Sequence, residues 1–149
     1  MNGQGLEPCR EVHLDGVHCG LTIRSFPGGV VVLKISGTDV GEFGDRPMSE
    51  LKECVQGTEA VRLFIDARDV RGASMKVSGG WAEWLRTNKT HFQNISMLTG
   101  SRYVEITADF VRRFAALESI MSIYTEPEIF DAALNQSFTP WTVTPGPPV

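Results

Sequence analysis

The chain has 149 residues, of which 42% are hydrophobic and 21% are charged, a composition typical of one globular domain with a single core. The formal net charge of -4 provides no basic field for binding phosphate groups, so we expect neither nucleic acid nor an anionic membrane as a partner. The N-terminus has no export signal, and no apolar run is long enough to span a membrane. The three cysteines are too few for a disulfide framework and odd in number, which indicates reduced thiols and a cytoplasmic location.

The first half of the folded region, after a flexible N-terminus at residues 1–10, has the patterns of three strands and one helix. Two segments alternate apolar and polar residues, as half-buried strands do, and a third is β-branched and almost continuously apolar, as in a strand covered on both faces. An acidic residue and a proline then open a helix with apolar residues at helical spacing. These patterns predict strands at 11–15, 21–24 and 30–35 and a helix from Asp45 and Pro47 to Gly57.

The second half alternates strands with helices. Short apolar runs indicate buried strands, and between them apolar residues recur at helical spacing behind a Ser or Thr that is able to cap a helix. The last helix is preceded by a capping box, and the tail that follows is rich in proline. We predict strands at 60–66, 95–98 and 120–124, helices that begin at Ser78, Thr107 and Thr125, and an extended tail at 137–149, docked through Trp141.

This order of elements predicts an α/β fold. Strict alternation of strand and helix implies right-handed crossovers and parallel strands. We therefore expect one domain, at residues 11–136, with a mixed sheet of about five to six strands that is mainly parallel in its second half, and about four helices.

The element order, a strand that ends in Asp66, a helix start near Ser78 and the closing segment 124–134 together resemble the STAS family. These are the domains of anti-sigma-factor antagonists and sulfate-transporter tails, with their SpoIIAA-like relatives. The resemblance implies a STAS-like fold and a regulatory domain that binds a protein partner, namely a kinase, an anti-sigma factor or a related regulator. It also implies that a serine at a helix start is phosphorylated.

Ser78 is the first candidate phosphoacceptor, and Ser74 is the second. Free N–H groups and the helix dipole at a helix start stabilise an added phosphate, and two glycines after Ser78 allow close approach. Val77 stands where the family has an Asp, and Gly79 stands where it has a second hydroxyl residue. A plain N-cap role is the alternative explanation for Ser78.

The predicted partner-binding edge follows the strand that ends in Asp66, because open α/β folds place their sites at the carboxyl ends of strands. Its candidate residues are Asp66, Arg68, Asp69, Arg71, Gly79, Gly80 and Trp81. The charged residues would also suit a surface cluster of ion pairs. Trp81 belongs either to the core or to an interface.

Two other functions remain open. One is a ligand-binding or catalytic protein with a pocket at the Asp66–Trp81 edge, and the other is a unit that forms homo-oligomers through an N-terminal sheet edge. We expect no enzymatic activity and no cofactor, because no nucleophile–base motif and no nucleotide-binding glycine motif occurs. The group of Cys9, His13, His18 and Cys19 has no zinc-module spacing, so we expect no metal there.

Overall fold

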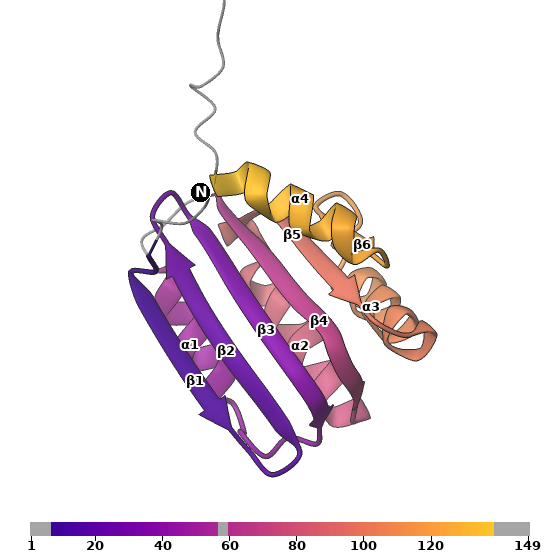
Figure 1. Ribbon diagram of the computed structural model, residues 1–149. Coiled ribbons are helices and arrows are strands. Elements are labelled where there is room, and N and C mark those ends of the chain that lie inside the picture. Colours follow the sequence, from indigo (N-terminus) through magenta and orange to yellow (C-terminus); the bar gives the residue numbers. More distant parts are fainter. Residues whose placement is uncertain (1–6, 57–59, 139–149) are drawn as a thin grey trace, which may run out of the picture.

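The computed structural model describes residues 7–56 and 60–138 and shows a six-stranded mixed sheet with helices on both faces (Figure 1). The strands lie in chain order across the sheet. The pairs β1–β2 and β2–β3 are antiparallel, whereas β3–β4, β4–β5 and β5–β6 are parallel. The strands are β1 Arg10–Asp15, β2 Cys19–Phe26, β3 Val30–Asp39, β4 Val61–Ala73, β5 Phe92–Thr99 and β6 Met121–Tyr124. The expected α/β class is therefore confirmed.

The helices form two unequal layers. Three of them pack on one face of the sheet, where Leu51, Leu85 and Val111 join the main hydrophobic core. The fourth lies across β5 and β6 on the opposite face, where Phe130 packs against Phe64 in a second core (Figure 1). The helices are α1 Arg46–Val55, α2 Met75–Asn88, α3 Arg102–Phe114 and α4 Pro127–Phe138, with a short 3-10 turn η1 at Lys89–His91.

Strand β4 extends to Ala73, so it does not end at Asp66 as the sequence predicted. Its second half pairs in parallel with the end of β3, with register shifts after Lys34 and Gly37. Charged and small residues in this half resemble a loop in composition, but pairing with a neighbouring strand satisfies the backbone and keeps it extended. The segment between the predicted strand end at Asp66 and the predicted helix start at Ser78 is therefore the end of β4 and the first turn of α2.

Helix α2 begins at Met75, and its N-cap is Ser74 instead of Ser78. The Ser74 hydroxyl accepts a hydrogen bond of 3.1 Å from the backbone N–H of Val77, while Ser78 lies inside the helix. The backbone N–H of Ser74 is held by the carbonyl of Asp39 at 2.9 Å, so the position of the cap is set by the end of β3.

Two other helices also begin away from the predicted residue. Ser101 caps α3, and Thr107 lies within the helix and donates its hydroxyl to the carbonyl of Tyr103 at 3.1 Å. At the start of α4, the carbonyl of Glu126 accepts hydrogen bonds from the N–H groups of Ile129 and Phe130, so Glu126 stands at the N-cap position that the sequence assigned to Thr125, and the helix begins at Pro127.

Several sequence predictions lie outside the described residues. They are the docking of the tail through Trp141, the residue Gly57 and the conformation of most of the N-terminal segment. Helix α1 itself ends at Val55, with Gln56 as its C-cap, and α4 continues to Phe138, past the predicted start of the tail at residue 137. In the part of the chain that is described, no helix combines the length and the apolar character needed to cross a membrane.

Candidate functional site

The residues predicted to form one binding edge lie on different sides of the sheet. Asp66 and Arg68 are on the face covered by α4, whereas Trp81 belongs to α2 and packs against the main core. Asp69 and Arg71 are exposed near the end of β4. The remaining two candidates, Gly79 and Gly80, lie within α2.

Asp66 and Arg68 form an internal ion-pair network that attaches α4 to β4. One Asp66 carboxylate oxygen accepts hydrogen bonds from the backbone N–H of Arg68 at 3.2 Å and from its Nε at 3.0 Å. The guanidinium also donates through Nη2 to Asp131 of α4 at 2.7 Å. The Asp66 hydrogen bond and then that of Asp131 hold the pKa of Arg68 above its ordinary value. This geometry gives the pair a structural role.

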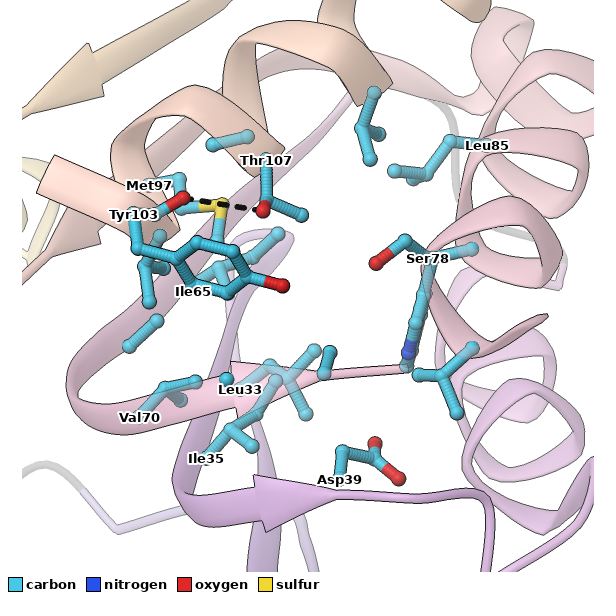
Figure 2. Close-up of a pocket in the computed structure, with 18 of the residues that line it drawn as sticks. Leu33, Ile35, Asp39, Ile65, Val70, Ser78, Leu85, Met97, Tyr103 and Thr107 are labelled. Carbon is cyan, nitrogen blue, oxygen red and sulfur yellow. Dashed lines mark hydrogen bonds between the residues drawn. The ribbon is translucent and has the colours of Figure 1, made fainter. Parts of the chain in front are cut away.

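Of the two candidate phosphoacceptors, Ser74 is the one that stands at a helix start. It follows the central strand β4 directly, and Met75 beside it has 91% of its surface exposed. A phosphate on Ser74 would sit where the first N–H groups of α2 and the helix dipole favour negative charge. Ser78 is placed differently, because its hydroxyl points into a cavity between α2 and α3 (Figure 2).

That cavity has a volume of about 100 Å³ and mostly apolar walls. Its walls include Leu33, Ile65 and Met97 from the sheet, Trp81 and Leu85 from α2, and Val104, Ala108 and Val111 from α3. Asp39 lies at one end, and the hydroxyls of Ser78 and Tyr103 point toward one another across it (Figure 2). Of the candidate residues of the predicted edge, Trp81 lines this cavity, but Arg68 and Asp69 do not.

Helix α3 carries a row of exposed apolar side chains, although apolar residues at helical spacing usually face the core. We call Tyr103, Ile106, Phe110 and Phe114 the α3 stripe; each is between 50% and 58% exposed. The rings of Phe110 and Phe114 stack with centroids 5.9 Å apart, and the Arg86 guanidinium of α2 lies 5.7 Å from the Phe114 ring centre. The signal was present, because these residues recur at helical spacing beside the buried row of Val104, Ala108 and Val111.

The N-terminal cysteines and histidines do not assemble into a metal site. Cys9 is exposed, whereas Cys19 is buried, and burial together with the charges of Asp39 and Glu42 raises its pKa to about 11. His13 lies 2.8 Å from a Glu11 oxygen, and His18 is 3.8 Å from Glu42. Within residues 7–56 and 60–138, no three His, Cys, Asp or Glu side chains are placed to hold an ion.

Comparison with known proteins identifies the fold. No family model matches the chain, and no curated protein matches it. A solved structure that is similar is an uncharacterized protein of the DUF3478 family with a SpoIIAA-like fold from Shewanella loihica PV-4. The two share 13% sequence identity with a TM-score of 0.59, over 81% of this chain and 98% of the other. The resemblance inferred from the sequence therefore holds at the level of the fold, and this chain has a SpoIIAA-like fold.

Proposed function

We propose that this domain is a non-catalytic regulatory module that binds a protein partner through the α3 stripe and the adjoining start of α2. The α3 stripe is the observation that carries the proposal, because a soluble domain rarely exposes a contiguous row of large apolar side chains without a binding role. Aromatic side chains are also the residues that most often act as interface anchors. Free thiols at all three cysteines are consistent with action in the cytoplasm.

The chemistry around the stripe favours a protein over a lipid surface. Binding to anionic lipid needs unpaired cations beside the apolar side chains. Here Arg86 pairs with Glu83 at 3.2 Å, and Arg113 pairs with Asp109 at 2.9 Å, so the bordering cations are neutralised. The stripe extends about 16 Å along α3, at about 1.5 Å per residue, which suits two to three turns of a partner helix.

Ser74 replaces Ser78 as the proposed switch. The Tyr103 ring, at one end of the α3 stripe, packs over Gly72, where an added Cβ would lie 3.5 Å from Cε2. Ser74 follows two residues later, so a phosphate there would place a charge of about -2 beside the apolar surface. The free-energy cost of removing water from that charge would weaken the binding of the partner. A phosphate on Ser78 would enter an apolar cavity, which disfavours modification at that residue.

The test compares two charge insertions at equally exposed apolar positions. Phe110→Glu interrupts the α3 stripe, and Ile129→Glu places the same charge on α4, on the other face of the sheet. The full-length tagged protein is used to capture partners from its source cells, and the affinity of any stoichiometric partner is then measured with both purified chains. We expect Phe110→Glu to weaken binding by about tenfold or more, with Ile129→Glu close to the unmodified protein.

Ser74→Asp, measured with the same purified partner, tests the switch. An acidic residue is accepted at an N-cap, so this variant keeps the fold while it adds charge beside Tyr103. Weaker binding is expected for Ser74→Asp and not for Ser74→Asn, which caps the helix without charge. If the two variants bind the partner with equal affinity, Ser74 is not the switch. If Phe110→Glu binds the partner as tightly as the unmodified protein, the α3 stripe is not the binding surface.

A further inference from the structure

We propose that a polar groove beneath α4 is a binding site for a small hydroxylated carboxylic acid. The carboxylate of the ligand pairs with Arg62, and its hydroxyl groups form hydrogen bonds with Asn94 and Ser96. These three residues lie on the face of the sheet that α4 covers, whereas the α3 stripe belongs to a helix that packs on the opposite face. This site therefore shares no residue with the surface proposed to bind a protein partner.

The groove lies between the C-terminal half of α4 and the starts of β4 and β5 (Figure 1). Arg62 of β4 and Asn94 of β5 stand side by side in the register of these two strands, and Ser96 follows on the same face of β5. Gln136 and Ser137 of α4 line the opposite side, and Gln136 is exposed, so the groove is open to solvent there. Its volume of about 350 Å³ is at the low end of the roughly 300–1,000 Å³ of small-molecule sites, so it suits a compact ligand.

Arg62 determines the charge of the ligand. Of the described residues that line the groove, it alone is charged. Its Nη2 atom donates a hydrogen bond of 3.3 Å to the carbonyl of Gly28, and no carboxylate of the described residues pairs with its guanidinium. A guanidinium binds a carboxylate through two parallel hydrogen bonds. One positive charge without a partner therefore favours a ligand with a single carboxylate.

Asn94 favours a ligand with hydroxyl groups. Its Oδ1 atom is enclosed by protein and accepts no hydrogen bond. Its amide nitrogen is not enclosed and also has no hydrogen-bond partner among the described residues. An unpaired buried acceptor is costly, and the terminal torsion of an asparagine is broad, so the amide can turn its oxygen toward a donor in the groove. A hydroxyl group both donates and accepts, and it thus satisfies either end of the amide.

Ser96 adds a second hydrogen-bonding group to the sheet side of the groove. The residue is 6% exposed, yet its hydroxyl is not enclosed and has no hydrogen-bond partner among the described residues. Tyr124 of β6 also lines the groove, and its hydroxyl has no partner within the described part of the chain. One cation, one amide and two hydroxyls thus belong to the lining of one small space, which favours a ligand that carries hydroxyl groups over one with an alkyl chain.

The experiment titrates the full-length ¹⁵N-labelled protein at pH 7 with gluconate, sorbitol and hexanoate, which share a linear six-carbon chain. Gluconate carries a carboxylate and hydroxyl groups, sorbitol lacks the carboxylate, and hexanoate lacks the hydroxyl groups. The amides of Asn94 and Ser96 report binding, and the indole N–H of Trp81, on the other face of the sheet, is the reference. We expect saturable shifts with gluconate and a dissociation constant of about 1 mM, as is typical of a ligand of this size. The affinities for sorbitol and hexanoate should be lower by about tenfold or more.

Two variants test the roles of the residues. Arg62→Gln removes the cation and should weaken gluconate binding by about tenfold or more. Arg46→Gln is the matched control, because it removes an exposed guanidinium from α1, on the opposite face of the sheet. Asn94→Leu should weaken gluconate binding by about fivefold or more, yet it should keep or raise the melting temperature, because it removes an enclosed oxygen that has no partner. A purely structural role of Asn94 would give the reverse pattern.

The proposal is overturned if gluconate gives no saturable shift at Asn94 or Ser96 up to about 10 mM. It is equally overturned if Arg62→Gln, still folded by its spectrum, binds gluconate as tightly as Arg46→Gln does. Sorbitol or hexanoate bound as tightly as gluconate would refute the assigned class of ligand. Because the affinity for the protein partner is measured separately, failure here leaves the proposed function unaffected.

Discussion

Replacement of Arg68 by methionine is expected to lower the free energy of unfolding by about 2–3 kcal/mol. Methionine keeps the aliphatic packing of the side chain but removes the guanidinium that joins β4 to α4. The side chain of Asp66 is 13% exposed and would lose a charged hydrogen bond of 3.0 Å, an interaction of about 1.5–3 kcal/mol. The Asp131 carboxylate is 48% exposed, so its pairing adds at most about 1 kcal/mol.

The assay is urea unfolding followed by circular dichroism, with Asp131→Ala as the matched variant. The loss from Arg68→Met stays below the 3–5 kcal/mol of a fully buried broken pair, since Asp66 keeps the backbone N–H of Arg68 as a donor. Asp131→Ala should cost about 0.5–1 kcal/mol, because it removes only the exposed arm. The structural role of this network would be refuted if Arg68→Met lowered the free energy of unfolding by less than about 0.5 kcal/mol, or if the two variants lowered it equally.

Three further predictions follow from other contacts. Ser74→Ala should destabilise the protein by about 1 kcal/mol in thermal unfolding, because it leaves the N–H of Val77 unpaired, whereas Ser74→Asp should cost less. Gly100→Ala should reduce the yield of folded protein in solubility and circular dichroism measurements, because its Cβ would collide with the backbone carbonyl of Arg68. At pH 8 a thiol reagent monitored by mass spectrometry should modify exposed Cys9 well before Cys19, whose burial raises its pKa to about 11 and so suppresses the thiolate; equal rates would contradict this.

The sequence alone was sufficient for the architecture. Alternation of polar and apolar residues marked the antiparallel strands β1 and β2, and continuous apolar runs marked the first half of β4. These signals are local, because the period of a side-chain pattern follows directly from the geometry of a strand or a helix. The strict alternation of strands and helices predicted that the second half of the sheet is parallel. The resemblance to the SpoIIAA-like fold depended on this order of elements.

Local sequence patterns could not predict the residue at which α2 begins. Ser74 and Ser78 are four residues apart and are both good N-cap residues, so propensity does not choose between them. The choice was made by β3, which pairs with β4 as far as Ala73 and holds the N–H of Ser74 at the carbonyl of Asp39. The position of the candidate switch thus depends on strand pairing between segments distant in the chain.

The roles of Asp66 and Arg68 show the same limit. Their charges and their position after an apolar run suggested an exposed binding edge, yet Asp131 of α4 turns them into an internal network. The helical spacing of apolar residues predicted that α4 has an apolar side. It did not predict which face of the sheet α4 covers. The sequence by itself determined which segments are strands and helices, because that depends on neighbours in the chain. Only the tertiary structure decided which charges are paired and where α2 and α3 enclose a cavity, because those depend on contacts between distant segments.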